Sequence, residues 1–163
     1  MLYHVLSSFM CFRFDAGTTW LQEVVYLALT EGDIASARAK PCYIRCPLLE
    51  DYRAQTKSIP HMKTPRLMKS HLPFEKLPTS TKDRDIRLIY IIRNPKDVAV
   101  SYYYFYQSLS ELGNYTGTWN EFLQMYLNGY VMYRDWFTHI KGWWEQCTNH
   151  RVLIVSYEEM KSN

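Results

Sequence analysis

The chain has 163 residues but little glycine and little net charge, and both shortages exclude classes of protein. Its six glycines rule out collagen-like sequence and glycine-rich linkers. The net charge of +3 is too small for a protein that coats nucleic acid, although a local basic pocket for an anion stays open. The apolar opening segment 1–12 is too short to span a bilayer and carries no signal-peptide features. We therefore expect no nucleic-acid partner and no membrane partner.

The sequence also lacks the cysteine spacing of a metal site. No C-x-x-C pair occurs, and the close pair Cys42 and Cys46 has only His61 as a nearby companion, so we expect no metal. Four cysteines without a disulfide-dense pattern fit a reducing compartment, which predicts a cytoplasmic protein. What the chain does have is 47% apolar and 16% aromatic residues, a composition that excludes disorder over most of its length.

Strand-like runs alternate with helical periodicity along the chain. We expect strands at 10–14, 66–70, 87–92 and 152–156. We expect helices over 18–30, over 95–109, from 119 onward and over 133–144. The segment 33–64 should hold one short helical piece and much loop, and 77–85 a polar connection. The apolar runs 87–92 and 152–156 are typical of buried strands, so we predict an α/β fold, a three-layer sandwich around a central parallel sheet, with 1–163 as a single domain.

Ligands bind beyond the carboxyl ends of the strands in such sheets, and one of the segments at those ends suits a phosphate. Gly17-Thr18-Thr19-Trp20 joins a strand to a helix, so the first amides of the helix and its dipole face the strand end. The string G-x-x-x-x-G-K-[ST] of nucleotide triphosphate sites is missing, which disfavours a nucleotide kinase. A plain helix cap by Thr18 or Thr19 explains the same residues equally well.

Two further strand ends carry polar side chains. Arg93 follows the buried strand and offers planar donors for a second anionic group, with a salt bridge to Asp97 as the alternative. Ser101, two turns along the next helix, could donate to the same anion, with a solvated or helix-packing serine as the alternative. Lys69 and His71 share one face of an extended segment, where an imidazole can take a proton from a hydroxyl and an ammonium can stabilise negative charge.

Aromatic residues are more numerous than a core of this size requires. Tyr102–Tyr106 reads YYYFY and would cover every side of a helix, and Trp143 and Trp144 are adjacent. We expect most of these rings to lie in the core and some to line a pocket for an apolar or phenolic acceptor.

Four strings together resemble the cytosolic sulfotransferase family: GTTWLQEVVYLALTEGD, RLMKSHLPFEKLP, RLIYIIRNPKDVAVSYYYF and VLIVSYEEMK. They occur in the family's order and close to its spacing, from Gly17 to the end of the chain. The resemblance implies a strand–loop–helix phosphate-binding motif like that of P-loop NTPases. It also implies transfer of a sulfuryl group from 3′-phosphoadenosine 5′-phosphosulfate, without a metal, to a hydroxyl (phenol, alcohol or steroid-like) or an amine of a small-molecule acceptor.

The resemblance also assigns roles to residues. The 5′-phosphosulfate would be held by the loop residues Ala16, Gly17, Thr18, Thr19 and Trp20, the last of them close to the adenine. The 3′-phosphate would be held by Arg93 and Ser101, and the adenine would be contacted by Tyr157. The acceptor site would be lined by Lys69, Ser70 and the catalytic base His71.

Two features depart from the family pattern. Asp15 stands where the family has the lysine that stabilises the leaving phosphate, and the chain stops at Asn163, before the family's later basic loop and its dimerisation segment. Residues 1–15 do not resemble the usual N-terminal region. We interpret the chain as a truncated or alternatively started member with a C-terminally incomplete domain, whose full-length relatives can form homodimers. A catalytically impaired pseudoenzyme or nucleotide-binding module is the alternative.

Overall fold

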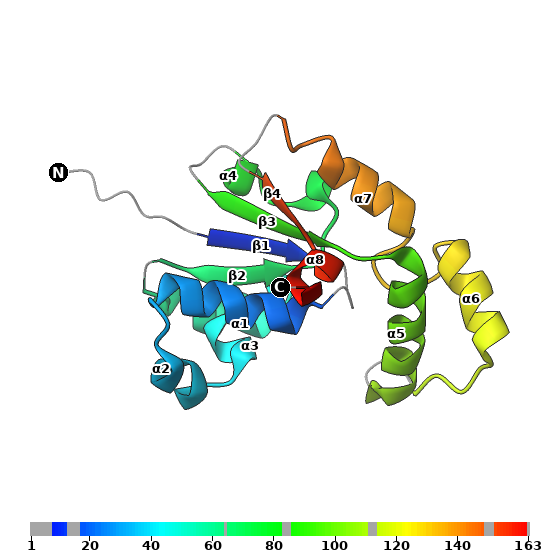
Figure 1. The fold of residues 1–163 in the computed structure, drawn as a ribbon, viewed down its shortest axis with the longest axis horizontal. Helices are drawn as coiled ribbons and strands as arrows, with labels where there is room; N and C mark the ends of the chain where they lie inside the picture. Colours follow the sequence, from blue (N-terminus) through cyan, green and yellow to red (C-terminus); the bar gives the residue numbers. More distant parts are fainter. Residues whose placement is uncertain are drawn as a thin grey trace.

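The computed structural model describes residues 8–12 (backbone only), 17–63, 65–82, 86–110, 114–148 and 152–162. Its strands are β1 (Ser8–Phe12), β2 (Leu67–Ser70), β3 (Arg87–Ile92) and β4 (Val152–Ser156). They form one parallel sheet in the order β2-β1-β3-β4 (Figure 1). Ser8 of β1 is opposite Leu67 on one side and Arg87 on the other. The carboxyl ends of all four strands therefore meet at the same edge of the sheet.

Helices fill the connections between the strands. The longer ones are α1 (Thr18–Leu29), α5 (Pro95–Ser108), α6 (Trp119–Leu127) and α7 (Trp136–Trp144). The short ones are α2 (Ile34–Ala39), α3 (Cys42–Arg45), the π-helix η1 (Ala54–Ser58), the 3-10 helices η2 (Ile59–His61) and η3 (Phe74–Lys76), α4 (Thr79–Lys82) and α8 (Tyr157–Ser162). Asn94 caps α5 by accepting the Lys96 amide at 2.9 Å, and Pro95 takes the first helical position, where its missing N–H costs nothing.

Side chains of β3 alternate between two helical layers, which confirms the predicted three-layer sandwich. Leu88 and Tyr90 pack with Trp143 of α7 in one buried cluster. Ile91 packs with Leu21 of α1 in a second cluster on the other face. Figure 1 shows α1, α2 and α3 on one side of the sheet and α7 on the other. Because both faces are covered, the central strands are apolar on both sides.

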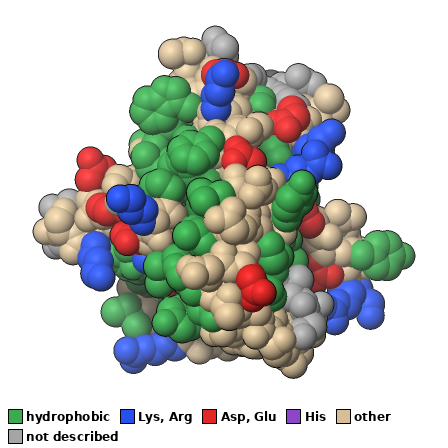
Figure 2. Space-filling model, turned by 90° about the vertical axis from the view of Figure 1, so that its right-hand side faces the viewer, with side chains coloured by type: hydrophobic (Ala, Val, Ile, Leu, Met, Phe, Trp, Pro, Cys, Tyr) green, Lys and Arg blue, Asp and Glu red, His purple; other side chains and the backbone are tan. Residues whose placement is uncertain are grey.

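A third apolar cluster joins α5 to α6 and accounts for much of the aromatic surplus. Tyr102, Tyr106 and Phe122 are buried in it, whereas Tyr104 in the same run is exposed. In the view of Figure 2, hydrophobic side chains gather over the face on this side of the molecule, with charged side chains scattered around them. Tyr103 and Phe105 are half-buried against the same cluster, so four of the five rings of the run 102–106 pack in or on the core, as expected.

Most element boundaries agree with the sequence prediction, and the exceptions have local causes. The first strand lies at Ser8–Phe12 rather than 10–14, whose last two residues lie outside the described ranges. The segment 33–64 is richer in helix than predicted, since it contains α2, α3, η1 and η2. The connection 77–85 is not wholly polar, because Leu77 is buried and α4 follows it.

Two further corrections concern the C-terminal half. Helix α7 does not begin at Tyr133: both Tyr133 and Arg134 adopt left-handed φ angles of 63° and 62°, and Asp135 then caps the helix by accepting the Thr138 amide. Strand β4 is not buried as predicted, since it lies at one end of the described sheet and Leu153 is 59% exposed. Within the described ranges, no helix is long and apolar enough to cross a membrane.

Candidate functional site

The loop after β1 forms the first part of the site. Gly17 is the N-cap of α1 and has a left-handed φ of 92°, a conformation that glycine adopts without steric cost. No side chain caps this helix in the described structure, so neither Thr18 nor Thr19 is the cap that the simpler explanation required. The first amides of α1 thus have no partner within the helix and point toward the strand ends, where an anion is favoured. Asp15 and Ala16 lie outside the described residues.

Tyr157, the first residue of α8, brings the predicted residues of three segments together. Its ring lies so close to Gly17 that a Cβ atom there would be 2.4 Å from Cδ2 of the tyrosine. The Trp20 ring meets it edge-on at a centroid distance of 5.8 Å, and Cζ of Arg93 lies 4.4 Å from its centroid. Four residues that the sequence analysis selected separately therefore form one cluster at the carboxyl ends of the strands.

A pocket of about 330 Å³ opens beside this cluster. It is lined by Arg93, Tyr157 and Lys161 together with the carboxylates of Asp97 and Glu158. Partial burial opposes ionisation of Glu158, but hydrogen bonds to its carboxylate and the nearby Arg93 charge lower its pKa overall. The donors are the Asn94 amide at 2.8 Å and the Ser156 hydroxyl at 3.0 Å.

The mixed charge of this pocket matters for an anionic ligand. An incoming phosphate therefore meets the carboxylates of Asp97 and Glu158 as well as the two cations, and the lowered pKa of Glu158 keeps that group ionised. Ser101 is half-buried on α5 and does not line this pocket, so its predicted part in holding the same anion stays a prediction.

The segment Lys69-Ser70-His71 at the end of β2 forms a second part of the site. Ser70 is fully buried, and His71 is 3% exposed with its ring 5.2 Å from that of Tyr133. The His71 amide donates to Oε1 of Glu50, and its carbonyl lies 3.1 Å from Nε2 of His139. The backbone at His71 is thus held from both sides, and Tyr133 covers its imidazole.

Sequence reasoning missed Glu50, which is the main acidic group beside His71. Burial raises the pKa of Glu50 even though the His71 amide and the Lys69 charge favour its ionised form. Burial raises the pKa of Tyr133 to about 12, and the negative charge of the Glu50 carboxylate adds to that rise. No periodicity marks Glu50, because it reaches β2 through a β-bridge between Leu48 and Lys69.

The raised pKa of Glu50 predicts a pH-dependent difference in stability. A carboxyl whose pKa is higher in the folded state stabilises the fold below about its ordinary value of 4.5 and loses that contribution as the pH rises through the raised value. Glu50→Gln has no charge to bury, so its free energy of unfolding should rise relative to wild type as the pH increases from 4 to 7. Urea unfolding at a series of pH values measures this.

Glu121 provides a matched control of opposite sign. Hydrogen bonds from the Thr118 amide and hydroxyl lower the pKa of Glu121, so its contribution is present above about 4.5 and lost as the pH falls. Glu121→Gln should therefore lose stability relative to wild type as the pH rises. If the free energies of unfolding of Glu50→Gln and wild type changed with pH in the same way, ionised Glu50 would cost the fold no stability.

The sequence of this chain is similar to those of known sulfotransferases. Residues 16–163 match the family model described as "Sulfotransferase domain". Sulfotransferase 1 family member D1 of Rattus norvegicus is 40% identical over 152 residues, and Sulfotransferase 1E1 of Homo sapiens is 39% identical over 152 residues. Both alignments cover 91% of this chain and 51% of the relative. The chain thus spans about half the length of the curated relatives it matches.

Solved structures agree with the sequence comparison. Mouse sulfotransferase SULT7A1 complexed with PAP superposes with a TM-score of 0.77 at 32% identity, covering 97% of this chain and 53% of that one. Retinol dehydratase in complex with androsterone and the inactive cofactor PAP gives a TM-score of 0.84 at 22% identity, covering 100% of this chain and 57% of that one. The second likeness concerns the fold alone.

Proposed function

Because this chain belongs to the sulfotransferase domain family, we propose that it transfers a sulfuryl group from 3′-phosphoadenosine 5′-phosphosulfate to a hydroxyl or amine of a small-molecule acceptor. The observation that carries the proposal is the convergence of Gly17, Trp20, Arg93 and Tyr157 at the carboxyl ends of the strands. A guanidinium and two aromatic rings suit a phosphorylated adenosine, and Gly17 lets one of those rings lie directly against the loop. We place the reaction in the cytoplasm, in keeping with the cysteine usage.

The donor would bind across this cluster. The amides at the start of α1 would hold the 5′-phosphosulfate, and the guanidinium of Arg93, with Ser101, would hold the 3′-phosphate. Trp20 is 39% exposed and Tyr157 lies beside it, so both rings are available for contact with the adenine.

The chemistry would be a direct in-line transfer. The acceptor oxygen attacks sulfur, the bond between sulfur and the bridging phosphate oxygen breaks, and 3′,5′-adenosine bisphosphate leaves. His71 takes the proton of the acceptor hydroxyl, and Lys69 stabilises negative charge beside it. Since His71 is only 3% exposed, with the Tyr133 ring against its imidazole, the side chains that bury it must move before an acceptor reaches the base.

Two measurements test the proposal together. Transfer of labelled sulfate from the donor to a simple phenol should be detectable with the purified chain. The bisphosphate should raise the melting temperature, because a ligand at about 100 times its Kd stabilises a protein by about 2.7 kcal/mol. Arg93→Gln should lose this shift, while Arg87→Gln, exposed at the opposite end of β3, should keep it. A rise in melting temperature without any sulfate transfer would show that the chain binds the nucleotide but does not catalyse the reaction. An unchanged melting temperature would show that the chain has no nucleotide site.

The contact between Gly17 and Tyr157 predicts a large effect of one methyl group. Gly17→Ala puts a Cβ atom against the tyrosine ring and forces alanine into a left-handed φ, so we expect lower stability and much weaker bisphosphate binding. Gly32→Ala is the matched control, because Gly32 also has a positive φ of 84° but nothing within 4 Å of its Cβ position.

The two glycine variants separate strain from contact. Gly32→Ala should cost about 1–2 kcal/mol in urea unfolding and leave bisphosphate binding unchanged. Gly17→Ala should cost more and also lose binding in a calorimetric titration. Equal losses of stability with binding retained in both variants would contradict the contact between Gly17 and Tyr157.

A further inference from the structure

A second and larger pocket lies at the opposite end of the sheet from the candidate site. It has a volume of about 660 Å³, within the usual range of small-molecule sites. Leu29 at the end of α1 and Leu67 at the start of β2 both line it. Because an α-helix rises about 1.5 Å per residue, Tyr26, the lining residue of α1 nearest to Gly17, lies about 13 Å from Gly17 along the helix. A ligand bound here would not touch the Gly17 loop.

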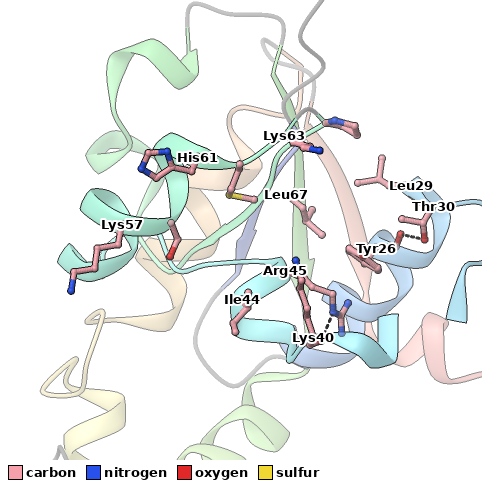
Figure 3. Close-up of a pocket in the computed structure, with 13 residues that line it drawn as sticks. Tyr26, Leu29, Thr30, Lys40, Ile44, Arg45, Lys57, His61, Lys63 and Leu67 are labelled. Atoms are coloured by element: carbon pink, nitrogen blue, oxygen red, sulfur yellow. Dashed lines mark hydrogen bonds between the residues drawn. The ribbon is translucent and has the colours of Figure 1, made fainter. Parts of the chain in front are cut away.

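The charges of this pocket are of one sign. Its described lining residues include Lys40, Arg45, Lys57 and Lys63 but no carboxylate. In the view of Figure 3, Lys63 lies at one end of the pocket and Arg45 at the other, with Leu67 between them. Since Glu23 pairs with Arg45, the positive potential of the cavity comes mainly from the three lysines, and it favours an anionic occupant.

Arg45 lines this pocket and carries one hydrogen-bond donor that has no partner among the described residues. Its side chain is only 5% exposed, with Nη2 paired to Glu23 and Nε donating to the Lys40 carbonyl at 2.8 Å. Its Cζ lies 4.4 Å from the centroid of the Tyr26 ring. The remaining nitrogen, Nη1, is buried and has no acceptor among the described residues. Burying a charged donor without a partner is costly, and an anion in the pocket would remove that cost.

The pocket also has apolar walls, beside the polar side chains of Thr30, Ser58 and His61. The apolar walls are formed by Leu29, Ile44, Met62, Pro65 and Leu67, and Figure 3 shows Ile44, Leu67 and Leu29 around the same space as Arg45. A bare inorganic anion would leave these walls in contact with water, whereas an apolar body would cover them. We propose that this pocket binds a small organic anion, in which a carboxylate or sulfate ester accepts from Nη1 of Arg45 and an aromatic or aliphatic body packs on the apolar walls.

Four probes of related shape test the two halves of this proposal on the purified chain. We expect 2-naphthoate and 2-naphthyl sulfate to bind in calorimetry about tenfold more tightly than neutral 2-naphthol, because a charged acceptor strengthens the bond to Arg45. Inorganic sulfate should bind more weakly than either anion. Added 3′,5′-adenosine bisphosphate should leave 2-naphthoate binding unchanged. Equal binding of the naphthol, or equal binding of inorganic sulfate, would overturn the proposal.

Variants and a methyl label locate the ligand. Lys63→Glu reverses an exposed charge of the pocket and should weaken 2-naphthoate binding about threefold, while Lys76→Glu, exposed on η3, should not. Arg45→Gln should abolish binding of 2-naphthoate. Because Arg45→Gln also breaks the ion pair with Glu23, it can unfold the protein, and Lys63→Glu then provides the test. The methyl signal of Met62 should shift on addition of 2-naphthoate. An unchanged Met62 signal, or equal affinity of the two lysine variants, would place the ligand elsewhere.

Discussion

Asp15→Lys is expected to speed sulfate transfer by this chain roughly 100- to 1,000-fold. In the transition state, negative charge builds up on the leaving phosphate and on the oxygens of the moving sulfuryl group. The resemblance to cytosolic sulfotransferases puts a lysine at this position of the loop, where its cation would stabilise that charge. Removing one such donor from an enzyme typically costs about 3–4 kcal/mol of barrier, and an anion in its place adds repulsion. The measurement is kcat/KM with labelled donor and a simple phenol.

Asp15→Asn separates the two contributions to that gain. It removes the negative charge without supplying a cation, so its rate should lie between those of wild type and Asp15→Lys. The same three chains should differ little in their free energy of unfolding, because the change concerns charge in the reaction rather than packing. Equal rates for the asparagine and lysine variants would contradict a part for the ammonium in the transition state.

His71→Ala should lower the transfer rate about 100- to 10,000-fold, the usual contribution of a positioned general base. The effect is best measured in the Asp15→Lys chain, where the rate is highest. The structure holds the His71 backbone at the end of β2 through Glu50 and His139. Loss of the ring should reduce kcat and leave the affinity for the bisphosphate unchanged, because the base does not contact the donor's nucleotide.

His61→Ala is the control for this prediction. His61 is exposed on η2 and lines the second pocket, far from the β2 end, so its removal should leave transfer unchanged. Tyr133→Ala uncovers the His71 ring and should lower the KM for the acceptor. An undiminished transfer rate in His71→Ala would show that His71 is not the base. It would not contradict the proposed nucleotide site.

The sequence predicts the strands and long helices well, because their signals are local. Arg87–Ile92 is a continuous apolar run, and Asn94-Pro95 after it is a cap followed by a first helical residue, so both boundaries follow from neighbouring side chains. The position of Gly17 between a strand and a helix likewise follows from the change of periodicity. The cluster around Tyr157 was predictable in outline, since parallel strands bring their carboxyl ends to one edge.

The missed features depend on contacts between distant segments. Glu50 meets His71 only because Leu48 bridges to Lys69, and no spacing of residues announces such a pairing. Tyr133 takes a left-handed conformation that its residue type does not favour, so the sequence placed the helix start too early. The exposure of β4 depends on its place at the end of the sheet, which the apolar composition of a strand does not reveal.

The interior position of β1 has a consequence for how the protein is made. Ser8 leaves the ribosome well before its two backbone partners, Leu67 and Arg87. Until then both edges of this strand lack hydrogen-bond partners, and unpaired strand edges promote aggregation. Pairing between residues so far apart in the chain is also slow. The nascent polypeptide therefore carries β1 without its two neighbours until β2 and β3 have been translated.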